Sequence, residues 1–146
     1  MIKLFTIGFT KKNAQTFFNL LTTNKVKKIV DTRVNNTSQL SGFAKGNDLA
    51  FFAKKIDNID YEHELDFAPT KELLSKYRKK NMTWEEYEDE YLNLLDMRKI
   101  KKKVNIEKLH ENCLLCSEHT VEKCHRRLLA EYLKVANNDV EIIHLK

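Results

Sequence analysis

The segment Cys113-Leu114-Leu115-Cys116 is a run of four apolar residues with no polar residue among them. An uninterrupted apolar run of this length is typical of a strand that is buried on both faces of a sheet. Such strands occur mainly in parallel sheets that helices cover on either side. The segment therefore predicts an α/β fold, and not an antiparallel sheet with one face in solvent.

Strand and helix patterns alternate on either side of this segment. Strands are expected at 2–7, 26–30, 59–63, 113–116 and 140–145. Helices are expected at 14–23, 48–56, 98–111 and 122–136, the first of them capped by Asn13. Two more helices are expected to start after the cap Thr70 and after the capping box of Thr83 with Glu86. A loop is expected at 35–47. The alternation predicts a single three-layer α/β domain over 1–146, with a mainly parallel sheet of about five strands and helices on both faces.

The overall composition narrows the class of protein. The chain has 146 residues, three cysteines and a formal net charge of +5. No apolar run approaches the roughly 20 residues that span a bilayer, and the start of the chain lacks the apolar core of a secretory signal. We therefore expect a cytoplasmic protein without a membrane partner, whose cysteines are reduced.

Two groups of basic residues flank an acidic one. The basic groups lie within 76–80 and 98–103, and the acidic residues lie within 85–90. Such runs are usually solvated helix surfaces of alternating sign. The alternative interpretation is a patch that binds the phosphates of a nucleic acid, with a steep dependence on salt.

Unusual polar residues follow four of the expected strands at the point where each strand ends. Gly8-Phe9-Thr10 follows the first strand, Asp31-Thr32-Arg33 the second, His63 with Glu64 the third, and Cys116, Ser117 and Glu118 the fourth. Ligands of open parallel sheets bind beyond the carboxyl ends of the strands. This agreement predicts a polar site at that edge of the sheet.

The densest part of the predicted site runs from Cys116 to Arg127. Cys124 lies near the start of the last long helix, where the helix dipole and neighbouring positive charge favour an anion or a thiolate. The candidate catalytic residues are Cys124, Glu118 and Asp31. The candidate anion-binding residues are Arg33, Arg126 and His125, supported by Cys116, Gly8 and His63. In the alternative structural interpretation, Cys124 is a small buried hydrophobic side chain and Arg126 is a structural partner of Asp31 or Glu118.

Metal and redox chemistry are weaker alternatives at the same segment. Cys116, Cys124 and His125, with His63 or His144, offer zinc ligands. Cys113 and Cys116 have Cys-x-x-Cys spacing, but no second Cys-x-x-Cys is present to pair with it, so we assign no metal. If the two cysteines face each other, they form a redox pair. The chain has no Gly-rich phosphate loop, no G-x-S-x-G and no HExxH, which argues against the standard nucleotide hydrolases, serine hydrolases and zinc proteases.

Several of these motifs together resemble a known family. They are Thr6-Ile7-Gly8, Val30-Asp31-Thr32-Arg33, Tyr61 with His63, Leu114-Leu115-Cys116-Ser117-Glu118, Cys124-His125-Arg126 and His144. The chain is similar to the prokaryotic domain-of-unknown-function family 488, over nearly its whole length. The resemblance implies a compact α/β domain with no established reaction, and it maps the recurring residues of the family to Cys116, Glu118, Cys124, His125 and Arg126. The chain departs from the family at Phe9-Thr10, where the family usually has His-Ser.

Two functions follow from these expectations. The first is an enzyme with an anion- or phosphate-binding site, acting on a nucleotide, a nucleic acid or another anionic small molecule. The alternative is a non-catalytic module that binds a nucleic acid or a protein through the basic groups 76–80 and 98–103. A third interpretation gives the segment from Cys116 to Arg126 only a role in stability. The sequence assigns neither a cofactor nor an oligomeric state.

Overall fold

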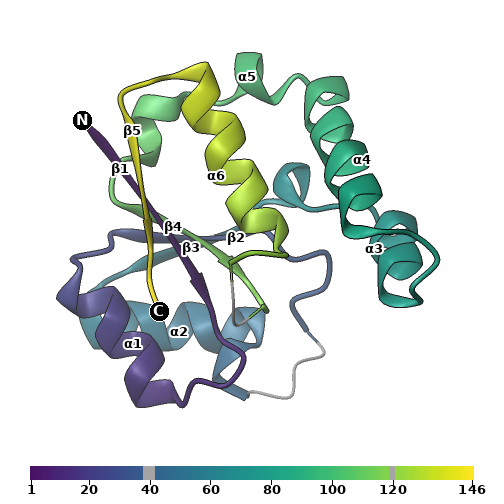
Figure 1. Ribbon diagram of the computed structural model, residues 1–146. Helices are drawn as coiled ribbons and strands as arrows, with labels where there is room; N and C mark the ends of the chain where they lie inside the picture. Colours follow the sequence, from purple (N-terminus) through teal and green to yellow (C-terminus); the bar gives the residue numbers. More distant parts are fainter. Residues whose placement is uncertain (38–41, 119–120) are drawn as a thin grey trace.

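The computed structural model describes residues 1–37, 42–118 and 121–146, and a parallel sheet of five strands forms its centre (Figure 1). The strands are β1 (Ile2–Gly8), β2 (Lys28–Asp31), β3 (Asp60–His63), β4 (Asn112–Cys116) and β5 (Val140–His144). They lie in the order β3-β2-β4-β1-β5, and every neighbouring pair is parallel. The expected sheet is confirmed, and the apolar segment 113–116 lies in its central strand.

The side chains of each strand alternate between two apolar clusters, one on each face of the sheet. In β4, Leu114 belongs to one cluster and Leu115 to the other, and both are fully buried. The same alternation continues to the strand ends, because successive side chains point to opposite faces. It assigns Cys116 to the face of Leu114, and Asp31 to the opposite face, which it shares with Ile29.

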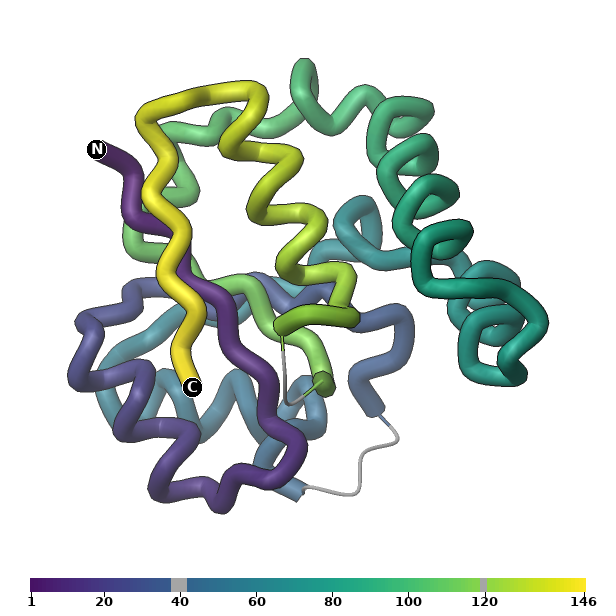
Figure 2. The backbone as a smooth tube through the Cα atoms, in the orientation of Figure 1, coloured from purple at the N-terminus to yellow at the C-terminus, as the bar shows by residue number. Residues whose placement is uncertain are grey.

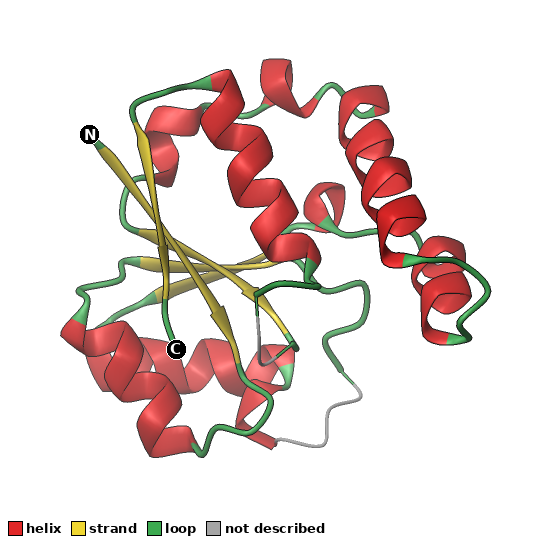
Figure 3. Cartoon of the chain, in the orientation of Figure 1, coloured by secondary structure: helices red, strands yellow, loops and turns green. Residues whose placement is uncertain are grey.

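Helices cover both faces of the sheet, as the α/β prediction requires (Figure 3). On one face lie α1 (Ala14–Thr23) and α2 (Gly46–Asp57), and on the other lie α3 (Lys71–Arg78), α4 (Trp84–Met97), α5 (Ile100–Lys103) and α6 (His125–Ala136). Short 3-10 turns occur at Gly42–Ala44, Leu65–Phe67 and Ile106–Leu109. Among the described residues, no helix combines the length and the apolar character that crossing a bilayer requires.

The predicted helix caps are confirmed. The side chain of Asn13 accepts a hydrogen bond from the backbone N–H of Thr16, and Thr70 accepts one from Leu73. Thr83 and Glu86 exchange side-chain and backbone hydrogen bonds of 3.1 and 3.0 Å, which is the expected capping box. These caps satisfy backbone donors that the first turn of a helix leaves unpaired.

Three of the expected elements differ in the structure. The helix predicted at 98–111 is wrong, because Lys99 adopts a left-handed conformation (φ 57°) and Val104 is extended, so that only α5 and a 3-10 turn form. The helix predicted from residue 122 begins at His125, because Cys124 is extended. The loop predicted at 35–47 contains the turn at 42–44 and the start of α2, and its residues 38–41 lie outside the described part.

The first and last strands of the chain lie side by side (Figure 2). In the register of β1 with β5, Thr6 is opposite His144. Their side chains meet as well, with Thr6 Oγ1 2.6 Å from His144 Nδ1. This contact places a hydroxyl group beside the carboxyl edge of the sheet, where the polar residues gather.

Candidate anion-binding site

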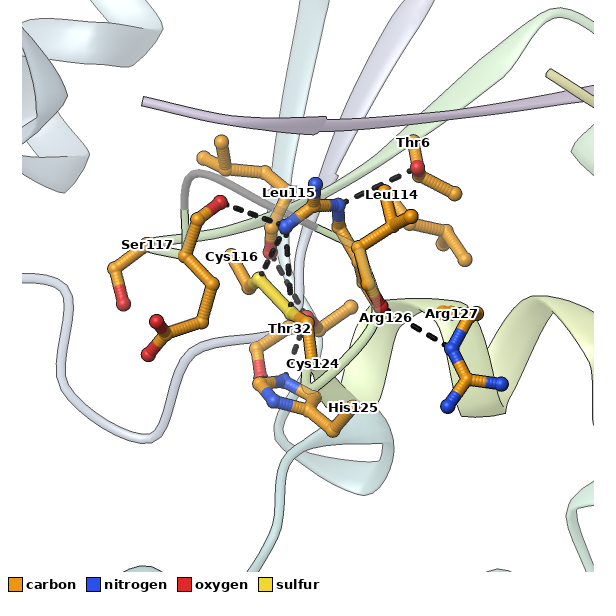
Figure 4. Close-up of a disulfide and its surroundings, with 12 residues drawn as sticks. Thr6, Thr32, Leu114, Leu115, Cys116, Ser117, Cys124, His125, Arg126 and Arg127 are labelled. Atoms are coloured by element: carbon orange, nitrogen blue, oxygen red, sulfur yellow. Dashed lines mark hydrogen bonds between the residues drawn. A yellow bond between two sulfur atoms is a disulfide. The ribbon is translucent and has the colours of Figure 1, made fainter. Parts of the chain in front are cut away.

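The connection from β4 to α6 brings two cysteines together. Cys116 is the last residue of β4, and Cys124 is the residue that precedes the first turn of α6. Their sulfur atoms are joined in a disulfide (Figure 4), although the sequence predicted reduced cysteines. The start of α6 lies beside the end of β4, so the residues at these two positions, Cys116 and Cys124, are neighbours. Both residues are buried, with exposed fractions of 1% and 2%.

The guanidinium of Arg126 lies against this pair. Its Nη1 donates to Cys116 Sγ at 3.0 Å, to Cys124 Sγ at 3.3 Å and to the backbone carbonyl of Glu118 at 2.8 Å (Figure 4). Its Nε donates to Thr6 Oγ1 at 3.3 Å. Burial lowers the pKa of Arg126 to about 10, so the side chain is still a cation at neutral pH. Arg126 is thus a structural partner of Glu118, as the alternative interpretation expects, but through the backbone carbonyl of Glu118 and, among the described residues, without an ion pair to Asp31 or Glu118.

Gly8 permits the close approach of these segments. A Cβ atom at this position would overlap the backbone carbonyl of Glu118 and lie 3.0 Å from Nη1 of Arg126. The following loop is held to the same segment, because the backbone N–H of Thr10 donates to the carbonyl of Ser117 at 3.1 Å. Gly8 therefore supports the site by leaving room for the segment that Arg126 holds.

His125 is a neutral side chain, and this corrects the positive charge that the sequence assigned to it. Burial lowers its pKa from 6.5 to about 4. Its Nε2 lies 2.9 Å from both the backbone carbonyl and the hydroxyl group of Thr32. A carbonyl oxygen only accepts, so Nε2 carries the proton and donates. Thr32 in turn donates its hydroxyl hydrogen to the carbonyl of Leu115. His125 therefore connects α6 to the ends of β2 and β4.

Asp31 orients Arg33. The carboxylate, which is fully buried, accepts from Nε of Arg33 at 2.8 Å, from Nη2 at 2.7 Å, from the backbone N–H of Arg33, and from the hydroxyl of Tyr61. Burial, and then the hydrogen bond to Asp31, raise the pKa of Tyr61 to about 12, so this hydroxyl stays a donor. With four donors, Asp31 has the geometry of a positioning residue, and its predicted role as a general base stays a prediction.

One nitrogen of the Arg33 guanidinium makes no hydrogen bond among the described residues. Nη2 of Arg33 also donates to the carbonyl of Ala44 at 2.7 Å, and the guanidinium lies over the ring of Phe9. Its Nη1 is buried and has no hydrogen-bond partner among the described residues. His63 supports the same loop, because its Nε2 donates to the backbone carbonyl of Arg33 at 2.6 Å. Arg33 is thus a buried, pre-oriented cation with unused hydrogen-bonding capacity.

A cavity of about 750 Å³ opens between α3, the ends of β2 and β4, and the start of α6. Its lining residues are Arg33, Val34, Asn35, Lys71, Leu74, Ser75, Arg78, Lys79, Cys116, Ser117, Glu118 and His125. Four of these side chains are cationic and one is anionic. The cavity is therefore suited to an anion, and its size falls in the range of sites for small molecules.

The basic residues on α3 were missed as part of this site. From the sequence, residues 76–80 were expected to form a separate surface, yet Arg78 and Lys79 line the cavity. The signal was present, because Lys71, Ser75, Arg78 and Lys79 follow the spacing i, i+4, i+7, i+8 that gathers side chains on one helix face. The spacing does not show which other part of the molecule this helix face lies against.

The structure brings together only part of the predicted set. Arg33, Cys116, Glu118 and His125 line the cavity. Cys124 and Arg126 lie next to Cys116 but are not among the lining residues. Of the two cysteines, Cys116 is the one that lines the cavity, whereas the sequence favoured Cys124 as the reactive residue.

Three buried side chains lie close enough together to act as ligands of one metal ion. One ligand atom from each of Cys116, Cys124 and His125 lies within 4.8 Å of the other two. His63 and His144, which the sequence offered as further ligands, make hydrogen bonds elsewhere, to Arg33 and Thr6. The guanidinium of Arg126 occupies one side of both sulfur atoms, and a second cation there would meet its charge. The residues therefore suit an arginine–sulfur cluster better than a metal centre.

The comparisons with known proteins identify a family and nothing more specific. A family described as "Domain of unknown function DUF488" matches residues 13–133, in agreement with the resemblance found in the sequence. No curated protein and no solved structure matches the chain. The matched range contains every lining residue of the basic cavity, whereas Thr6 and Gly8 precede it.

Proposed function

The chain belongs to the domain of unknown function DUF488, and from the chemistry of its site we propose that it is an enzyme that acts on a phosphorylated or similarly anionic small molecule of nucleotide size. The observation that carries this proposal is the cavity at the carboxyl edge of the sheet, with four cationic side chains in its lining and one carboxylate. Ligands of open α/β sheets bind at this edge.

The cations of the cavity divide into a fixed one and three adaptable ones. Arg33 is buried and held by Asp31, so its guanidinium lies at a defined position, and its Nη1 has no hydrogen-bond partner among the described residues. Lys71 and Arg78 on α3, and Lys79 directly after it, are exposed side chains that adjust to the anion. A guanidinium makes directional, charge-assisted hydrogen bonds to phosphate oxygens, and lysines add point charges. This combination fits a phosphate group that Arg33 orients and that α3 neutralises.

Two groups beside the cations supply chemistry. The carboxylate side chain of Glu118 is exposed and lines the cavity, which suits a general acid or base. Cys116 lines the same cavity, and its reduced thiol would act as a nucleophile there, with Cys124 beside it. Arg126 positions both sulfur atoms and does not reach the ligand.

Binding of adenosine monophosphate tests the proposal, with adenosine and inorganic phosphate as the two partial ligands. By calorimetry, we expect the monophosphate and phosphate to bind and adenosine to bind far more weakly. Replacement of Arg78 by Ala should weaken binding at least tenfold, which is about 1.4 kcal/mol. The matched control is Lys102→Ala, which removes an exposed charge on α5, outside the cavity. Equal affinity for monophosphate and nucleoside, or an Arg78→Ala variant that binds as the wild type does, would overturn the proposal.

Turnover separates an enzyme from a binding protein. Mixtures of nucleotides are incubated with the protein and followed by ³¹P nuclear magnetic resonance. Glu118→Gln is expected to bind the substrate but to lower its turnover at least about a hundredfold, since general acid–base groups typically contribute at this level. Unchanged spectra for every nucleotide that binds would reduce the function to binding.

The alternative module must use two basic groups that the structure separates. One lies on and after α3 and the other around α5, with α4 between them (Figure 1). α4 has 14 residues, so it is about 21 Å long at 1.5 Å per residue. Arg98 already donates to the carbonyls of Asp66 and Ala68. Binding of duplex DNA that Lys102→Ala weakens as much as Arg78→Ala does would favour this alternative.

A further inference from the structure

The buried charge of Arg126 lacks a carboxylate partner. No ion pair joins Arg126 to an acidic side chain among the described residues, and its exposed fraction is 1%. Its acceptors are a hydroxyl, a backbone carbonyl and the two sulfur atoms of Cys116 and Cys124. Burying a cation without a counter-ion is costly. Of these acceptors, only the sulfur atoms can take on a negative charge at neutral pH.

The charge of the sulfur atoms depends on their redox state. As a disulfide they are neutral, and the guanidinium is uncompensated. On reduction, one of them can become a thiolate 3.0 to 3.3 Å from Nη1 of Arg126. The surroundings therefore stabilise the reduced, charged form, as well as holding the two sulfur atoms close enough to bond.

We propose that Cys116 and Cys124 are a redox-active dithiol–disulfide centre with Arg126 as its counter-ion, and that small disulfides carrying carboxylates reach it through the basic cavity. The redox chemistry stands on the cysteine pair and Arg126 alone. The preference for an anionic substrate rests on the proposed anion-binding function of the cavity. Cys116 lines that cavity and Cys124 does not, so Cys116 is the attacking residue.

The exchange balances in two steps. The Cys116 thiolate attacks one sulfur of the substrate R–S–S–R, the substrate S–S bond breaks, and one RS⁻ leaves. Cys124 gives its proton to that thiolate and attacks Sγ of Cys116, which forms the Cys116–Cys124 bond and releases the second RS⁻. The substrate disulfide gains two electrons and the protein loses two. The reverse reaction, with two RSH molecules, restores the dithiol.

The third cysteine provides an internal control. Cys113 is fully buried in the apolar cluster on the opposite face of the sheet and is not part of the disulfide. Burial raises the pKa of its thiol, so it should not exchange. Cys113→Ser should therefore behave as the wild type does.

The test uses the full chain after reduction and removal of the reductant. It is exposed at low salt to three probes, namely glutathione disulfide (anionic), hydroxyethyl disulfide (neutral) and cystamine (cationic). Intact mass and peptide mapping follow the loss of two hydrogen atoms and the Cys116–Cys124 link. We expect the link with all three, with a rate at least about tenfold higher for the anionic than for the cationic probe, and a ratio that falls as salt is added.

Variants then assign the steps. Cys124→Ser should accumulate a mixed disulfide on Cys116, whereas Cys116→Ser should not accumulate one on Cys124 at a comparable rate. The Arg78→Ala, Lys79→Ala double variant should lose the preference for the anionic probe but still oxidise with the neutral one.

The outcomes separate the two proposals. If the link forms with no dependence on probe charge, the substrate preference is overturned, and with it the support for the anion cavity, while the redox centre stands. If no probe produces the link, or if the reduced protein retains one zinc ion that blocks alkylation of Cys116 and Cys124, the redox centre is overturned whatever the cavity binds.

Discussion

Two cavities of similar size lie in different parts of this molecule, and their walls have opposite chemistry. One, of about 590 Å³, lies between α1, the turn at 42–44 and α2, and its lining residues are Ala14, Gln15, Phe18, Asn19, Gly42, Phe43, Asp48, Phe52 and Ile56. The other is the basic cavity beside α3. Among the residues that the structure describes, the lining of the first contains no cation, whereas the lining of the second contains four.

The two walls arise from different kinds of element. The apolar cavity lies between two helices and a turn, largely among exposed side chains, where aromatic rings pack on one another, with Phe18 in contact with Phe43 and Phe52. The basic cavity is built from strand ends and one helix face, where side chains are held by hydrogen bonds that cross between elements. Volume alone therefore does not identify a functional site, whereas converging polar groups with unused hydrogen-bonding capacity do.

The sharpest test of this contrast is Phe18→Ala. Phe18 is 5% exposed, so its removal should lower the free energy of unfolding by about 3–5 kcal/mol through lost burial and a larger void. Urea denaturation measures the change, and Phe51→Ala, at a ring that is 57% exposed, should cost less than about 1 kcal/mol. Nucleotide affinity of the folded Phe18→Ala protein should be unchanged, and a loss of affinity would show that the two cavities act as one.

The stability of the protein should depend on pH through His125, which lines the basic cavity. Its pKa is about 4 in the folded protein against 6.5 in the unfolded chain, so the unfolded chain binds more protons between these values. Stability from this residue is therefore complete above pH 6.5 and falls by about 3 kcal/mol as the pH decreases towards 4. Urea denaturation of wild type and His125→Gln across this range isolates the contribution. Parallel curves for the two proteins would contradict a buried, neutral His125.

The smallest expected effect comes from Thr83→Ala, in neither cavity. Loss of the capping box should destabilise the protein by about 1 kcal/mol, and Thr83→Ser should restore most of it. Thermal unfolding measures both variants. Affinity for adenosine monophosphate should not change, so this variant calibrates how much a loss of stability alone affects binding. A drop in affinity comparable to that of Arg78→Ala would mean that the cavity responds to global stability.

The sequence alone determined the local structure. The apolar run 113–116 predicted a buried central strand, the alternation of patterns predicted the parallel sheet, and Asn13, Thr70 and Thr83 marked three helix starts. These features depend on residues that are close in the chain, so spacing is enough to find them. The prediction of a helix at 98–111 was wrong because the spacing of apolar residues does not show that Lys99 adopts a left-handed backbone conformation.

The tertiary structure alone decided how the polar residues pair. Arg126 meets Thr6 across 120 positions of sequence, and His125 meets Thr32 across 93. Such contacts depend on strand order and on the path of each crossover, which periodicity does not encode. For the same reason the face of α3 was visible as a pattern, but its place opposite Cys116 and Arg33 was not. The sequence thus located the edge at which chemistry gathers, and the packing of distant segments decided which groups face the cavity.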